Sequence, residues 1–156
     1  MKKKSKEVYF AYQNLKIWVL IFLLACSSQP NTSRDFNKYL SNFDSQISEN
    51  EHYYVILSRY GCSSCSEIFL TDFMAKSQSS NQTKFTFIIG NNKQYAWPKN
   101  SISEFIFDKK ELISRLNLNI ADFTVLKTEK RIILAVWNFG AGDSNKFQRF
   151  LNEELK

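Results

Sequence analysis

The chain has 156 residues, enough for one domain, because a single hydrophobic core is filled by roughly 100 to 150 residues. Its hydrophobic fraction of 44% and aromatic fraction of 15% exclude an intrinsically disordered chain. The formal net charge of +6 would suit nucleic-acid binding, but five of the 21 basic residues precede Cys26. The rest of the chain has 16 basic and 14 acidic residues, a net charge of only +2. We therefore expect no nucleic-acid partner.

The chain opens with a basic stretch followed by a short apolar run. Lysines at positions 2, 3, 4 and 6 precede an apolar run of nine residues, Ile17 to Ala25, which ends at Cys26. This is the pattern of an export signal. Nine residues are too few for a stable transmembrane helix, which needs roughly 20. We expect residues 1–25 to be a signal peptide that is removed.

The boundary of this leader carries a second motif. Leu23-Leu24-Ala25-Cys26 resembles the lipobox of bacterial lipoproteins, in which a small residue precedes the cysteine that receives lipid before cleavage. The resemblance implies acyl chains such as palmitate on Cys26, a polar tether over residues 26–33, and a folded domain held at the cell envelope, facing the periplasm. By resemblance to Gram-negative lipoproteins, Ser27 favours the outer membrane. An ordinary signal peptide that ends near a cysteine is the alternative.

Residues 34–156 alternate between helical and strand patterns. Apolar residues at separations of three or four predict a helix over 34–47. Residues 53–59 form an aromatic and β-branched run, which indicates a buried central strand. A helical pattern over 62–76 and a second apolar run over 84–90 follow. The order strand, helix, strand predicts a parallel unit with a right-handed crossover.

The second half of the domain predicts a hairpin and a last helix. Residues 91–103 have the composition of a loop, and 105–107 fit either a short strand or a helix end. Two apolar runs flank a polar turn, as in an antiparallel hairpin. The expected elements are a helix over 108–116 with Asp108 as N-cap, strands over 123–126 and 132–137 joined by 127–131, and a helix over 144–155 capped by Asp143.

A Cys-x-x-Cys motif, Cys62-Ser63-Ser64-Cys65, stands where the first strand gives way to a helix. With the hairpin and the last helix that follow, this arrangement resembles the thioredoxin-like superfamily, over roughly residues 51 to 156. The leader makes the envelope-facing branch of that superfamily the most similar. The resemblance implies an α/β fold with a central mixed sheet of about four strands flanked by helices, and thiol-disulfide exchange with other envelope proteins.

The position of the motif has a chemical reason. The reactive species in thiol chemistry is the thiolate, and the unpaired N–H groups at a helix N-terminus stabilise that anion. Ser64 and Glu67 have capping-box spacing, which also predicts a helix start at this point. We expect Cys62 to act as nucleophile and Cys65 to resolve the mixed disulfide. We expect no cofactor.

The chain departs from the superfamily's pattern around the motif. Gly61 takes the place of the usual aromatic residue, with Tyr60 before it, and Ile56 takes the place of a buried acid. The superfamily's cis-proline falls near Ala121-Asp122, where this chain has none. By the resemblance, these two residues together with Tyr60 and Gly61 form the substrate-facing loops.

Several alternatives to catalysis stay open. Cys62 and Cys65 could form a permanent disulfide in a binding module that catalyses nothing. A zinc or copper site is disfavoured, because His52 is the only histidine and a tetrahedral site needs four ligands. Peroxide reduction is disfavoured because the peroxiredoxin motif is missing. We assign Trp97 and Trp137 to the core rather than to a binding surface.

Overall fold

The computed structural model describes residues 31–57, 63–79, 84–90 and 104–155. For residues 63–66, 78 and 79 it describes the helical backbone and not the side chains. The chain divides into two compact units, Met1–Asn31 and Thr32–Lys156, and the described residues belong almost entirely to the second. Cys26, Tyr60, Gly61 and Cys62 lie outside the described residues, as do Trp97 and the loop predicted over 91–103.

The described part of the domain is built on one mixed sheet, whose five strands have the order β3-β2-β1-β4-β5. β1 pairs in parallel with β2, and β2 in parallel with β3, whereas β4 is antiparallel to both β1 and β5. The predicted α/β class with a mixed sheet flanked by helices is confirmed. The prediction of about four strands is corrected to five, because residues 104–107 form a strand. The strands are β1 (His52–Leu57), β2 (Lys84–Ile89), β3 (Glu104–Phe107), β4 (Phe123–Glu129) and β5 (Ile132–Phe139).

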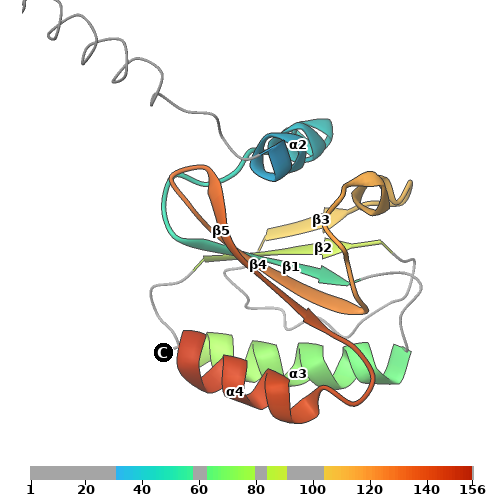
Figure 1. Ribbon diagram of the computed structural model, residues 1–156, viewed down its shortest axis with the longest axis vertical. Coiled ribbons are helices and arrows are strands. Elements are labelled where there is room, and N and C mark those ends of the chain that lie inside the picture. The colour runs from blue at the N-terminus through green and yellow to red at the C-terminus, as the bar shows by residue number, and fades with distance from the viewer. Residues whose placement is uncertain (1–30, 58–62, 80–83, 91–103, 156) are drawn as a thin grey trace, which may run out of the picture. The chain divides into compact units, whose positions relative to one another are not determined.

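Helices cover both faces of this sheet (Figure 1). α3 and α4 lie side by side on one face, where the Gln148 amide of α4 donates to the Asp72 carboxylate of α3 at 2.7 Å. α2 lies on the other face. The helical elements are α2 (Asn31–Leu40), the 3₁₀ turn η1 (Ser41–Phe43), α3 (Ser63–Ser79), the 3₁₀ turn η2 (Leu112–Arg115) and α4 (Ser144–Glu154).

The sequence of β1 explains its central position. All six of its residues are buried, which matches the continuous apolar run read from the sequence. Because successive side chains point to opposite faces, Tyr53 and Val55 join the core beneath α3 and α4, whereas Tyr54 and Ile56 join the core beneath α2. One strand thus supplies both layers of the core.

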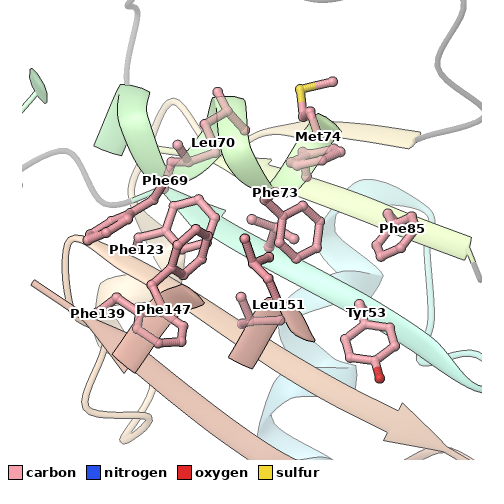
Figure 2. Packing of buried hydrophobic residues seen from close by; sticks show 14 of the residues in the cluster. Tyr53, Phe69, Leu70, Phe73, Met74, Phe85, Phe123, Phe139, Phe147 and Leu151 are labelled. Carbon is pink, nitrogen blue, oxygen red and sulfur yellow. The ribbon is translucent and has the colours of Figure 1, made fainter. Parts of the chain in front are cut away.

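The core between the sheet and the α3–α4 pair is made largely of phenylalanine (Figure 2). Phe73 of α3 is fully buried, and its ring meets Phe85 edge-on at a centroid distance of 5.3 Å. Phe147 of α4 lies 4.7 Å from Phe69 of α3 and 4.9 Å from Phe139 of β5. Trp137 is half-buried against the same cluster, as assigned from the sequence. These rings join both helices to the sheet.

Three predicted helix boundaries are wrong. The first helix begins at Asn31, inside the range assigned to the tether, and ends at Leu40 rather than Ile47. It cannot continue past η1, because Asp44 has a left-handed backbone with φ 53°. Ile47 is nevertheless buried in the same apolar cluster as Leu40, and its N–H donates to Asn37 Oδ1 at 2.9 Å. The helix over 62–76 extends to Ser79, into the range assigned to a loop.

The predicted helix over 108–116 is reduced to the single 3₁₀ turn η2. Glu111 has a left-handed backbone with φ 54°, which interrupts helical geometry immediately before Leu112. Asp108 does bind a backbone amide, as predicted for a cap, but the amide is that of Ile113 at 2.8 Å. Asp108 therefore closes a loop rather than capping an α-helix.

The last two predicted elements are present with altered details. The hairpin turn comprises only Lys130 and Arg131, both at positive φ (51° and 62°), as in the type I′ turns of two-residue hairpins. Asp143 stands at the N-cap of α4, but its side chain makes no capping bond there. Its carboxylate accepts the Gly140 N–H at 2.9 Å instead. Asp143 thus stabilises the loop before the helix.

Candidate functional site

The parallel strands all end at the same side of the sheet, which we call the C-terminal end of the sheet. Leu57, Ile89 and Phe107 are in register there. Gly90 N–H donates to the Leu57 carbonyl at 3.2 Å, and Asp108 N–H donates to the Ile89 carbonyl at 2.9 Å. In α/β sheets this end is where loops gather and ligands bind. The predicted cysteine motif begins five positions after Leu57 along the chain.

α3 begins at Ser63, between the two cysteines of the motif. Residue 65 is therefore in the first turn of the helix, and Phe69 follows one turn later. The Phe69 ring lies 5.8 Å from the ring of Phe123, the first residue of β4. The first turns of α3 are thereby held against the C-terminal end of the sheet.

Ala121 and Asp122 lie at this same end. They precede Phe123, which pairs with Leu57 across the antiparallel β1–β4 ladder. Ala121 N–H donates to the Thr124 hydroxyl at 3.0 Å, and that hydroxyl donates to Asn138 Oδ1 at 2.7 Å. Thr124 is fully buried, so its hydroxyl fixes the Ala121-Asp122 loop to β4 and β5. Of the four predicted loop residues, these two are the ones that the structure describes.

A pocket of about 420 Å³ opens beside this loop. Gly90 closes it on the β2 side, and polar side chains such as Ser114 and Asn119 line it. Sequence reasoning missed these residues. The alternation of leucine and asparagine over 116–119 could have indicated two of the lining residues, Asn117 and Asn119, because Leu118 is buried and both asparagines are exposed. The pocket lining consists of Gly90, Glu111, Ile113, Ser114, Leu116, Asn117, Asn119, Ile120, Ala121 and Asp122.

Asp108 forms a buried polar contact behind the pocket. The Tyr39 hydroxyl of α2 donates to Asp108 Oδ2 at 3.3 Å, and both residues are buried. Burial raises the pKa of Tyr39, and the neighbouring Asp108 carboxyl raises it further. Tyr39 therefore stays protonated as a donor, which ties the end of α2 to the C-terminal end of the sheet.

His52 lies at the opposite end of the sheet, at the start of β1. Its Nε2 is 2.8 Å from the Thr86 hydroxyl, and its ring packs against Tyr54. Burial, and secondarily the charge of Lys84, lowers the pKa of His52 to about 4, so the ring is neutral near pH 7. Among the side chains described, no three from His, Cys, Asp and Glu gather as metal ligands do. His52 acts there as a core residue.

In comparisons with known proteins, no family model, no curated protein and no solved structure matches this chain. Over the described ranges, none of the helices combines the length and the apolar character that crossing a membrane requires.

Proposed function

We propose that this chain is a membrane-anchored thiol-disulfide oxidoreductase that exchanges disulfides with envelope proteins through Cys62 and Cys65. One observation carries the proposal. α3 begins at Ser63, between the two cysteines, and the strand before it is buried along its whole length. A cysteine at such a helix start is exposed to unpaired N–H groups and to the positive end of the helix dipole, which favour the thiolate.

The exchange itself needs two steps. The Cys62 thiolate attacks one sulfur of a partner disulfide, forming a mixed disulfide and releasing the other partner sulfur as a thiolate. The Cys65 thiolate then attacks Cys62 Sγ, which releases the second partner thiolate and leaves a Cys62–Cys65 disulfide. Two electrons move from the pair to the partner, and the reverse sequence oxidises a partner dithiol. The reduction potential of the pair sets the direction.

The arrangement of elements supports a thioredoxin-like fold for this domain. The parallel β1-α3-β2 unit, the β4–β5 hairpin and α4 follow the order on which the resemblance rests. The edge strand β3 is an addition to that order. The Ala121-Asp122 loop, the counterpart of the superfamily's cis-proline loop, lies at the C-terminal end of the sheet, where the strand before the motif ends.

The anchor is part of the proposal. The basic start, the short apolar run and the lipobox-like Leu23-Leu24-Ala25-Cys26 support lipidation of Cys26 and attachment to the envelope membrane. Replacing the lipidated sulfur tests this. Cys26→Ser should shift the protein from the membrane fraction to the soluble fraction, and continued membrane association of that variant would contradict the anchor.

An insulin-reduction assay with dithiothreitol as electron donor tests the exchange activity. The full chain in detergent should accelerate insulin precipitation, and Cys62→Ser should abolish the acceleration. Cys65→Ser is the matched control, because it retains the attacking thiol and should accumulate a mixed disulfide with the partner. Equal rates for wild type and Cys62→Ser would contradict the proposal.

A binding module with a permanent disulfide is the second candidate. It is favoured by Ile56, which is fully buried where the superfamily has a buried acid and so offers no proton acceptor beneath the motif. A disulfide that survives millimolar dithiothreitol in the folded protein would support this candidate over exchange.

A further inference from the structure

The α2 helix enters the domain at the end of the sheet that lies farthest from the cysteine motif. Ile133 N–H, at the start of β5, donates to the Ser33 side chain at 3.0 Å. Ile133 pairs with Thr128 near the end of β4, and Thr128 pairs with His52, the first residue of β1. We call this side, which carries the β4–β5 turn, the hairpin end of the sheet. α2 then runs towards the other end, where Tyr39 meets Asp108.

An apolar surface lies beside this entry point. Leu134 and Val136 of β5 are 54% and 39% exposed, and they are two of the four large apolar side chains with such exposure among the described residues. Lys127 pairs with Ala135 and Thr128 with Ile133, so Leu134 is the extra residue of a β-bulge. β5 is also an edge strand of the sheet. We call Leu134 and Val136 the β5 patch.

The tether is short compared with the sheet. Five residue spacings separate Cys26 from Asn31, the first residue of α2, so a fully extended tether reaches roughly 18 Å. β4 has seven residues, which span roughly 20 Å from one end of the sheet to the other. With its C-terminal end on the lipid, the domain would need a fully extended tether merely to cover the length of the sheet. The hairpin end, where α2 enters, is therefore the end favoured to lie nearer the membrane.

We propose that the β5 patch rests on the lipid bilayer as a second contact beside the Cys26 acyl chains, which turns the cysteine motif away from the membrane. The inference rests on the lipid anchor of the proposed function. Exposed apolar side chains next to an anchor point enter the interfacial region of a bilayer, because that removes them from water. Phe107, another exposed apolar residue, lies at the C-terminal end of the sheet, beyond the reach of that surface.

This orientation defines the class of partner. Val136 pairs with Leu126 and Leu134 lies level with Lys127 and Thr128, so the β5 patch is three to five residues of β4 away from Phe123. The C-terminal end of the sheet, with the pocket and the Ala121-Asp122 loop, therefore lies roughly 10 to 15 Å farther from the lipid than the β5 patch does. A partner disulfide must therefore lie at this distance above the lipid surface to meet the cysteine motif. The fitting partners are soluble envelope proteins or the protruding domains of membrane proteins, and not disulfides at the lipid surface.

Spin labelling of the full lipidated chain tests the orientation. With Cys62→Ser and Cys65→Ser in place, and Cys26 blocked by its lipid, a nitroxide is attached at Leu134→Cys or, as matched control, at Ser114→Cys, an exposed position beside the pocket. Each protein is reconstituted into phosphatidylethanolamine–phosphatidylglycerol vesicles. Accessibility to oxygen, which concentrates in lipid, is compared with accessibility to an aqueous nickel chelate.

The expected result is a higher ratio of oxygen to nickel accessibility at position 134 than at position 114. Equal, water-like ratios at both positions in membrane-bound protein would overturn the orientation while leaving the anchor intact. Shielding of position 134 from both reagents, with spin–spin broadening that grows with protein density, would identify a second copy as occupant and overturn the proposal. Failure of the protein to remain on the vesicles would overturn the anchor and this inference with it, whereas the insulin assay would be unaffected.

Discussion

Removal of the Thr124 hydroxyl is the most informative single change near the site, because that hydroxyl holds the Ala121-Asp122 loop. In Thr124→Val the side chain keeps its shape and loses two hydrogen bonds, one accepted from Ala121 N–H at 3.0 Å and one donated to Asn138 at 2.7 Å. Each contributes about 1 kcal/mol net, so the expected cost is about 2 kcal/mol of the free energy of unfolding. Ala121 and Asn138 are half-buried, and water can satisfy part of their loss.

Thr124→Ser is the matched control, because it keeps the hydroxyl and removes one methyl group, which costs about 0.8 kcal/mol. Urea unfolding measures both variants, with the m-value expected to stay constant. The Ala121 amide should also exchange its hydrogen faster in Thr124→Val, by roughly tenfold for each 1.4 kcal/mol of lost local stability. The reasoning would be refuted if Thr124→Val were no less stable than Thr124→Ser, or if exchange at Ala121 were unchanged.

Three further predictions concern the fold. Folding lowers the pKa of His52 to about 4, so the protein should lose stability as the pH falls from about 6.5 to 4, by roughly 3 kcal/mol at most. Urea midpoints measured across this pH range should show the loss in wild type. The same loss in His52→Gln would contradict the assignment. Phe73→Ala should lower the free energy of unfolding by about 3 to 5 kcal/mol because Phe73 is fully buried, whereas Ile68→Ala on the exposed side of α3 should change it by no more than about 0.5 kcal/mol. Similar melting temperatures for the two variants would count against the packing described. The double variant Lys130→Asn, Arg131→Gly should raise the melting temperature, since both positions have positive φ and asparagine followed by glycine is favoured in such a turn. A melting temperature below that of Lys130→Ala would argue against the turn.

The periodicity of the sequence predicts most of the fold because the core faces are so apolar. β1 is buried on both faces and contains six consecutive residues that suit a central strand, so its position follows from composition alone. The same holds for α4, where Phe147 and Leu151 mark one helical face. What periodicity could not predict are the helix ends at Leu40 and before Leu112, because left-handed residues such as Asp44 and Glu111 set them. Apolar periodicity carries no signal for a left-handed backbone at a non-glycine residue, although aspartate adopts it more readily than most residues do.

The candidate site likewise has a part that the sequence predicts and a part that it does not. The helix start at the cysteine motif was predictable because a strand pattern changes to a helix pattern there. The pocket was not predictable, because its wall comes from η2 and the segment after it, which are assembled by the tertiary contact of Asp108 with Ile113 and Tyr39. Such contacts join residues up to 69 positions apart, beyond any local pattern.

The central claim is that the start of α3 activates Cys62, and the pH dependence of its alkylation tests this most directly. In Cys65→Ser, with Cys26 lipidated, Cys62 is the single free thiol, and its reaction rate with iodoacetamide follows the thiolate fraction. The account predicts a midpoint well below the value of about 8.5 for free cysteine, in the range of roughly 3.5 to 7.5. A midpoint at or above about 8.5 would contradict the account.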